Sequence, residues 1–283
     1  MKRNGMPSHH FPSIADKFIE IGNLRIAYKD EGRGQVILCL HALGHSSKDF
    51  LSLYDLPITD YRIVSIDFPG QGKSEGADQP ASSAFYAQIA AACIEALGLK
   101  DIAIVGNSIG GATAIRLASN NPNVAMLSLS NPAGLDKKGW LAPIFLNFMV
   151  RFFQKGVAGK AFFPKMFARY YNFVLSGKPA LARKQEIVQD AVRLAPLLVQ
   201  GWKSFKLPDE DLRPLIETVR CPVLFTWGVK DLFVQFGRNK KAIEKFPDHE
   251  LIKYPIGHTP YIECPELFLN DFRAFLQKTI PPQ

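Results

Sequence analysis

The segment GNSIGG, residues 106–111, combines the residue types needed to hold a serine hydroxyl at a sharp bend. It lies between the apolar run IAIV and a stretch rich in small residues, which predicts strand, turn and helix in that order. Flanking glycines let such a turn form without steric collision, and the helix start offers N–H groups to developing negative charge. The pattern favours a nucleophile at Ser108 over a structural glycine-rich turn.

A serine nucleophile needs a general base and an acid that orients this base. Asp231 comes shortly after the apolar run PVLFTWG, and His258 comes shortly after LIKYP. Parallel sheets present catalytic groups on loops that follow their strands. We therefore expect Asp231 to orient His258, and His258 to take the proton of Ser108. Four competing residues lie in charged stretches or before a strand and are less well placed: Asp209, Asp211, Asp248 and His249.

Acyl transfer also needs N–H groups that stabilise an oxyanion. We expect one from Ile109, directly after the serine, and the other from Leu43 in the loop HALGH, residues 41–45. His41 is expected to bond to the backbone of this loop. His41 and His45 are four residues apart, but they lack the acidic residue of an H-E-x-x-H site, so no metal is expected.

The tripeptide GKS, residues 72–74, resembles the end of a phosphate-binding loop. Such a loop needs its first glycine at position 67, where this chain has Asp67. The segment is better interpreted as a turn that leaves a strand. We expect no nucleotide, metal or other cofactor.

Strand-like and helix-like segments alternate along most of the chain. Residues 18–22 and 24–32 predict a hairpin, because two alternating stretches meet at a Gly-Asn pair. The helix expected at 82–97 has a serine cap at Ser82 or Ser83 and Gly98 at its end. Further strands are expected at 36–40, 61–67, 101–106, 124–130, 221–228 and 250–255, and further helices at 110–121, 237–246 and 265–278. This alternation predicts an α/β fold, with a mostly parallel central sheet and helices on both faces.

The alternation stops between residues 134 and 212. This interval is helical in pattern, and together with Arg213 it carries 14 Lys or Arg against 6 Asp or Glu, whereas the rest of the chain has 20 of each sign. From Lys137 to Lys184 there are ten basic residues and no acidic one. One segment thus accounts for the net charge of +8. We expect a helical cap at 134–212, inserted into a core formed by 1–133 and 213–283.

Aromatic residues are interleaved with the basic residues of the expected cap. Such a cap shapes an apolar pocket over a nucleophile, so we expect a small apolar or lipid-like ester as substrate. Either the aromatic faces pack inward and the basic faces are solvated, or the cap docks on an anionic membrane. No nucleic-acid-binding fold accompanies the charge, so nucleic acid is not an expected partner. The aromatic residues are Phe145, Phe148, Phe152, Phe153, Phe162, Phe163, Phe167, Tyr170, Tyr171 and Phe173.

The termini and cysteines favour a cytoplasmic protein, with peripheral membrane contact as the alternative. Residues 1–12 contain Lys2 and Arg3 without an apolar run behind them, unlike a secretory signal. The chain contains no run of 18 apolar residues, the length that a membrane-spanning helix needs. The cysteines are widely spaced, and Cys39 and Cys93 lie in segments typical of inert buried thiols.

Five segments, HALGHSS, DFPGQGKS, GNSIGG, WGVKD and GHTPYIECPE, resemble the α/β-hydrolase superfamily in order and spacing over nearly the whole chain. The resemblance implies a catalytic triad of Ser108, Asp231 and His258. It also implies an oxyanion hole formed by the N–H groups of Leu43 and Ile109.

Particular positions refine this resemblance. Serine at position 108, instead of aspartate, is unlike the haloalkane dehalogenase and epoxide hydrolase branches. Asn107 resembles the elbow of the meta-cleavage carbon–carbon bond hydrolases, which usually have tryptophan after the catalytic histidine, whereas Thr259 follows here. Ala42 stands where many members have glycine, a change expected to narrow the pocket.

We expect a serine hydrolase that cleaves a carboxylic ester through an acyl-enzyme, which water activated by His258 then hydrolyses. The same triad could instead hydrolyse a carbon–carbon bond of a vinylogous diketone. A third hypothesis is a non-catalytic ligand receptor on the same fold, because a fold alone does not determine function.

Overall fold

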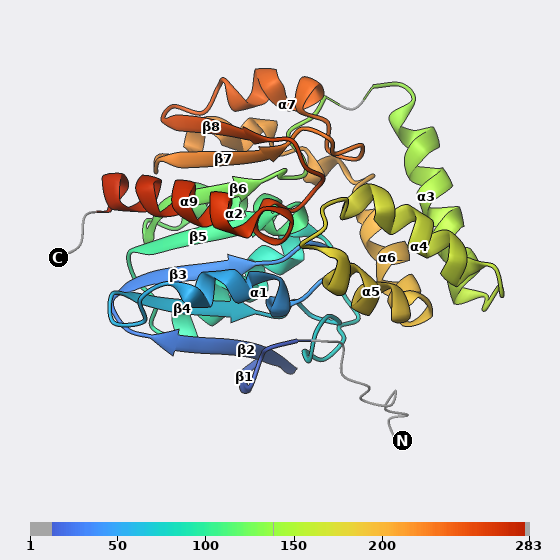
Figure 1. The fold of residues 1–283 in the computed structure, drawn as a ribbon, viewed down its shortest axis with the longest axis horizontal. Helices are drawn as coiled ribbons and strands as arrows, with labels where there is room; N and C mark the ends of the chain where they lie inside the picture. The colour runs from blue at the N-terminus through green and yellow to red at the C-terminus, as the bar shows by residue number, and fades with distance from the viewer. Residues whose placement is uncertain (1–12, 138, 281–283) are drawn as a thin grey trace.

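The computed structural model describes residues 13–137 and 139–280, so the N-terminal segment considered above as a signal lies outside the described residues. Within these ranges one eight-stranded sheet has the order β1-β2-β4-β3-β5-β6-β7-β8 (Figure 1). The β1–β2 and β2–β4 pairs are antiparallel, and the remaining pairs are parallel. The strands are β1 (Lys17–Ile21), β2 (Leu24–Gly32), β3 (Gln35–Leu40), β4 (Tyr61–Ile66), β5 (Ile102–Asn107), β6 (Val124–Ser130), β7 (Val223–Gly228) and β8 (His249–Tyr254).

The apolar runs of the sequence form the buried centre of this sheet. In β3, Leu38 and Leu40 contribute to the hydrophobic cluster on one face, and Ile37 and Cys39 contribute to the cluster on the other. Side chains alternate between the two faces of a strand, so a strand covered on both sides must be apolar throughout. Each strand segment expected from the sequence is present, which confirms the mostly parallel α/β fold.

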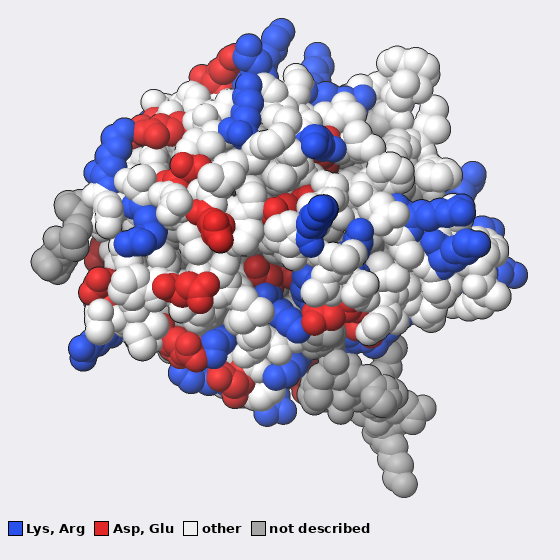
Figure 2. Space-filling model, viewed as in Figure 1, with Lys and Arg blue, Asp and Glu red and all other residues white. Residues whose placement is uncertain are grey.

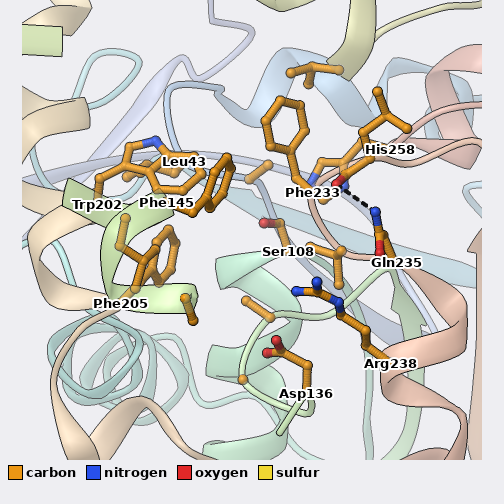
Figure 3. Close-up of a pocket in the computed structure, with 18 of the residues that line it drawn as sticks. Leu43, Ser108, Asp136, Phe145, Trp202, Phe205, Phe233, Gln235, Arg238 and His258 are labelled. Carbon is orange, nitrogen blue, oxygen red and sulfur yellow. Dashed lines mark hydrogen bonds between the residues drawn. The ribbon is translucent and has the colours of Figure 1, made fainter. Parts of the chain in front are cut away.

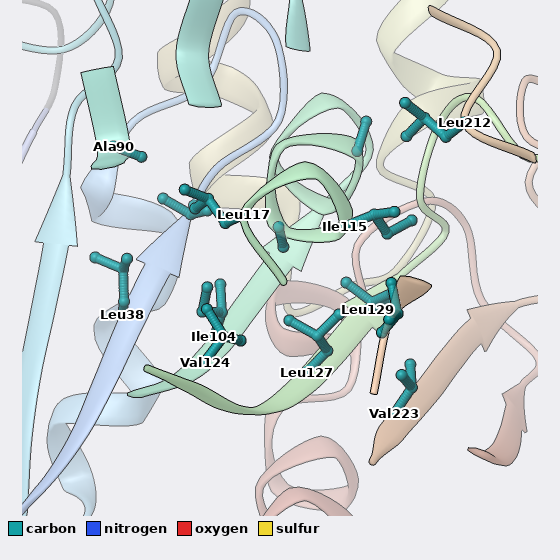
Figure 4. Packing of buried hydrophobic residues seen from close by; sticks show 14 of the residues in the cluster. Leu38, Ala90, Ile104, Ile115, Leu117, Val124, Leu127, Leu129, Leu212 and Val223 are labelled. Atoms are coloured by element: carbon teal, nitrogen blue, oxygen red, sulfur yellow. The ribbon is translucent and has the colours of Figure 1, made fainter. Parts of the chain in front are cut away.

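Helices cover both faces of the sheet. On one face Ala90 of α1, Ile115 of α2 and neighbouring side chains pack on the strands (Figure 4). On the other face Phe50 and Phe268 belong to a second cluster, which involves η1 and α9. The helices of these layers are α1 (Ser83–Ala96), α2 (Ile109–Asn120), α7 (Phe236–Ile243), α8 (Pro260–Glu263) and α9 (Pro265–Thr279), with the 3-10 helices η1 (Ser47–Asp55), η2 (Pro208–Glu210) and η3 (Arg213–Thr218).

The helix expected at 237–246 is shorter than the sequence indicated. α7 ends at Ile243, because the Phe246 N–H bonds to the Ile243 carbonyl three residues back, which is a tighter turn than an α-helix makes. The sequence analysis also missed η1 and α8, which are short and follow loops. The start of α1 was predicted correctly, since the Ser82 hydroxyl accepts the Phe85 N–H.

Between β6 and β7 the described residues include four α-helices that pack around a hydrophobic cluster of their own. They stand beyond the end of the sheet where the parallel strands finish (Figure 1). Their bounds are α3 (Ala142–Val157), α4 (Phe163–Val174), α5 (Leu181–Gln189) and α6 (Ala191–Ser204). We refer to α3–α6 as the cap; the expected boundaries at 134 and 212 stay a prediction. Leu212, at the second boundary, is buried in the cluster of the sheet.

The aromatic residues of the cap divide between its interior and its surface. Phe153, Phe163 and Phe167 are fully buried, as expected for side chains that pack inward. Phe148 and Phe162, in contrast, are more than half exposed. Within the described ranges, no helix combines the length and the apolar character needed to cross a bilayer.

Candidate active site

Ser108 occupies a sharp turn between β5 and α2. Its backbone has φ 54° and ψ −117°, a strained conformation for a residue other than glycine. A Cβ on Gly106 would lie 2.7 Å from the Gly110 carbonyl oxygen, and one on Gly110 would lie 2.1 Å from the Leu40 carbonyl oxygen. Only glycine therefore fits on either side of the serine.

His258 and Asp231 lie on the loops after β8 and β7, and the fold brings them together. The imidazole Nδ1 is 2.5 Å from Asp231 Oδ2, and both side chains are buried. Because Nδ1 donates its proton to the carboxylate, Nε2 is left as the acceptor that a general base needs. Burial alone would lower the pKa of His258, but the charge and hydrogen bond of Asp231, with a smaller effect of Glu263, raise it above 6.5.

Asp231 is held by a residue that the sequence analysis passed over. Asn131, at the end of β6, donates to Asp231 Oδ2 over 2.8 Å and accepts the Gly228 N–H over 2.8 Å. The other carboxylate oxygen accepts the N–H groups of Phe233 and Val234. The signal that could have found Asn131 is its position directly after the strand expected at 124–130. Together with His258, Asn131 and the two N–H groups fix the carboxylate through four donors.

The loop that carries His258 is braced from two sides. Asn107, next to the serine, donates to the His258 carbonyl over 3.0 Å, and its own oxygen accepts the Thr259 hydroxyl over 3.3 Å. The buried carboxylate of Glu263 accepts the N–H groups of Gly257 and Thr259, each over 3.0 Å. Asn107 and Thr259, two of the positions that distinguish this chain within the family pattern, therefore belong to one hydrogen-bond network.

The loop expected to form the oxyanion hole is also fixed by side chains. The Phe68 N–H donates to His41 Nε2 over 3.0 Å, and His41 Nδ1 lies 2.7 Å from the Ala42 carbonyl, so His41 shapes the loop as expected. Gln71 accepts the Gly44 N–H over 2.6 Å. Within the described part of the chain, the N–H groups of Leu43 and Ile109 donate to no other group. Their role as an oxyanion hole stays a prediction.

Ser108 and His258 border one cavity of about 570 Å³ beneath the cap (Figure 3). Its walls are mostly apolar, and Ala42, at the position where glycine is common, lines it. Among the described residues no hydrogen bond joins the Ser108 hydroxyl to the imidazole. Such contacts commonly tighten only when a substrate is bound. Aromatic and aliphatic lining comes from both core and cap: Leu43, Phe145, Tyr170, Tyr171, Leu198, Trp202, Phe205 and Phe233.

His45 is hydrogen-bonded to a carboxylate that also contacts the cap. Its Nδ1 is 2.5 Å from Asp49 Oδ2, and Asp49 Oδ1 accepts Arg183 Nε of the cap over 2.7 Å. The described residues contain no group of three or more potential metal-binding side chains.

The other candidates from the sequence lie away from the cavity. The carboxylates of Asp209 and Asp211 pair with arginines, and His249 bonds to the Phe246 carbonyl. None of these three, nor Asp248, borders the cavity. The Lys73 N–H in the segment GKS bonds to Asp67, as expected for a turn.

Comparison with known proteins agrees with this architecture. A family model described as alpha/beta hydrolase fold matches residues 35–265. The chain belongs to this family. Its relatives in the family include 2-hydroxy-6-oxo-6-phenylhexa-2,4-dienoate hydrolase from Burkholderia cepacia, which is 24% identical over 90% of this chain and 94% of that protein.

Two solved structures illustrate the shared fold. A bacterial membrane phospholipase A has a TM-score of 0.80 and 23% identity, with 94% of this chain and 86% of that chain covered. A thermophilic esterase from Thermogutta terrifontis has a TM-score of 0.79 and 19% identity, with 93% and 99% covered. At these identities the similarity establishes the fold alone.

Proposed function

We propose that this α/β hydrolase is a serine hydrolase that cleaves carboxylic esters of apolar substrates through an acyl-enzyme. The observation that carries the proposal is that Ser108 and His258 border one cavity while Asp231 fixes the imidazole through Nδ1. A nucleophile, a base and an orienting acid in this relation are the parts that acyl transfer requires.

In the proposed reaction His258 Nε2 takes the Ser108 proton as the serine oxygen attacks the ester carbonyl. The N–H groups of Leu43 and Ile109 stabilise the oxyanion, and His258 returns its proton to the departing alcohol. Water then attacks the acyl-enzyme, with His258 again as base. This second step releases the acid and restores the serine.

The cavity favours an apolar substrate of moderate size. Its volume of about 570 Å³ lies within the range of small-molecule sites, and aromatic side chains from the cap and core line it. One side of Ser108 is lined by Phe145, Trp202 and Phe205, and His258 lies on the opposite side of the serine (Figure 3). Solved neighbours described as an esterase and as a lipase agree with ester chemistry.

Turnover of 4-nitrophenyl esters of graded chain length tests the proposal. We expect hydrolysis that is fastest for acyl chains long enough to reach Phe145 and Trp202, and a loss of at least about 10⁴-fold in Ser108→Ala. No hydrolysis of any ester in the series, or activity retained by Ser108→Ala, would refute the proposal.

Carbon–carbon bond hydrolysis is the second candidate function. It is favoured by several relatives that are 24% identical and named as meta-cleavage dienoate hydrolases, and by Asn107 in the elbow. Thr259 and the absence of tryptophan after His258 argue for ester cleavage. Comparing kcat/KM for a 4-nitrophenyl ester with that for a 2-hydroxy-6-oxo-dienoate separates the two, and preference for the dienoate would select this candidate.

A further inference from the structure

One face of α3 carries large side chains that the rest of the described chain leaves uncovered. These exposed side chains recur at spacings of three and four residues, so they form one stripe along the helix. Ile144 is 61% exposed and Phe148 is 63% exposed, while Met149 and Phe153 on the opposite side are buried in the cap. We call this stripe the α3 surface; it consists of Leu141, Ile144, Phe148, Arg151 and Lys155.

The α3 surface changes character along the helix. Its first half is apolar, and Trp140, directly before it, is 82% exposed. Its second half is basic, and exposed Lys160 and Lys165 follow on the next turn and on α4. Basic side chains gather over the far tip of the cap, whereas uncoloured ones cover the first turns of α3 (Figure 2). Within the described ranges, none of these basic residues forms an ion pair with an acidic one.

This combination of groups matches the surface of a membrane. Trp and Phe side chains are stabilised at the boundary between headgroups and acyl chains, and Lys and Arg nearby attract anionic headgroups. A second copy that docked through its own cap would bring the same excess of positive charge, because residues 134–213 carry 14 basic and 6 acidic residues. Charge complementarity therefore favours an anionic lipid surface.

The apolar half of α3 also continues into the cavity. Trp140, Leu141 and Phe145 are exposed to solvent and at the same time line the cavity that contains Ser108. A bilayer in contact with these residues would lie against the cavity mouth.

We propose that the α3 surface docks on an anionic lipid bilayer, with Trp140, Ile144 and Phe148 at the acyl boundary and Arg151 and Lys155 at the headgroups. In this orientation the cavity mouth faces the bilayer. The docking does not depend on the proposed ester chemistry.

Vesicle flotation of the full chain tests the proposal with phosphatidylcholine vesicles and with vesicles containing one quarter phosphatidylglycerol. We expect binding to the anionic vesicles only. Ile144→Glu with Phe148→Glu should lower the partition coefficient at least ten-fold. Arg151→Gln with Lys155→Gln should lower it by about 25-fold, since each basic group near a membrane contributes about five-fold.

Matched controls carry the same changes elsewhere on the surface. Ile58→Glu with Leu267→Glu adds two charges at side chains that are 53% and 57% exposed, and Lys241→Gln with Lys245→Gln removes two exposed charges at or near α7. Both controls should bind vesicles like the wild type. Every variant should hydrolyse a water-soluble ester normally, because none of the changed residues lines the cavity.

Three outcomes would overturn the proposal. One is equal binding to both vesicle types, and another is binding that the α3 variants and the controls weaken alike. The third combines two results: the wild type does not bind vesicles, and analytical ultracentrifugation finds a dimer that Phe148→Glu dissociates. This outcome would assign the α3 surface to a second copy of the chain.

Discussion

The Asn107 amide donates to the carbonyl oxygen of His258 over 3.0 Å and to that of Ser130 over 2.8 Å. One side chain thereby ties β5, the strand before Ser108, to the loop that carries the imidazole. The spacing between nucleophile and base therefore depends on a residue that need not touch substrate.

Asn107→Ala should lower kcat for a 4-nitrophenyl ester by roughly 10- to 100-fold, because a small displacement of a catalytic group is costly. KM should change little, since Asn107 does not line the cavity. Thr259→Val removes only the 3.3 Å contact to Asn107 and should cost less than about ten-fold. If both variants kept full kcat, Asn107 would have no positioning role.

The pH dependence of kcat/KM should report the ionisation of His258. Only the neutral imidazole can accept the serine proton, and the pKa of His258 lies above 6.5. Activity should therefore rise with pH through an apparent pKa above 6.5. Asp231→Asn removes the charge that raises this pKa, so the remaining effect of burial should shift the rising limb of the pH profile to lower pH. The rate should also fall by roughly 10⁴-fold. A limb that did not move in this variant would contradict the assignment of the pair.

Phe145 and Phe148 offer a comparison within one helix. Phe145 lines the cavity, whereas Phe148, one turn later on α3, does not. Phe145→Ala should lower kcat/KM for a hexanoate ester by roughly ten-fold and leave an acetate ester nearly unchanged, because only the longer chain loses apolar contact. Phe148→Ala should hydrolyse both soluble esters like the wild type. Equal effects of the two substitutions would place the acyl site elsewhere.

The ion pair between Arg183 and Asp49 should contribute to stability. Burial raises the pKa of Asp49, but the charges and hydrogen bonds of His45 and Arg183 lower it more, below its usual value. Arg183→Leu removes one partner of a buried charge and should lower the free energy of unfolding by about 3 kcal/mol or more at pH 7, measured in urea. Lys184→Leu changes the neighbouring residue, whose amine bonds to Asn172, and should alter this free energy by less than about 0.5 kcal/mol.

The same pair has a defined pH dependence. A carboxyl group whose pKa is lowered on folding stabilises the protein at pH values above its pKa in the unfolded state, which is about 3.9. This contribution is lost as the pH falls below that value toward the pKa of the folded state. The difference in stability between wild type and Arg183→Leu should therefore shrink below about pH 4. A difference that was unchanged by acid would mean that Asp49 is not the group involved.

The sequence was sufficient for the features that follow from local rules. Apolar runs bounded by Gly and Pro predicted the strands. Ser108, Asp231 and His258 were selected because they follow strands whose carboxyl ends a parallel sheet brings to one edge. The cap helices were expected from the loss of alternation and the concentration of positive charge.

The residues that support the site could not be predicted, because their partners are distant in sequence. Asn131 contacts Asp231 a hundred positions later, and Glu263 accepts N–H groups from Ser176 and Gly177 as well as from its own loop. The exposure of Phe148 was equally hidden, since a helix with apolar residues on every side does not reveal which of them the fold will cover.

Labelling with an active-site-directed fluorophosphonate, followed by peptide mass spectrometry, tests the central claim most directly. The wild type should carry one stoichiometric adduct on Ser108, and Ser108→Ala should carry none. His258→Ala should react at least about 100-fold more slowly, because the serine would lack its base. An adduct on another residue, or no adduct at Ser108 in folded protein, would contradict the mechanism and favour a ligand receptor on this fold.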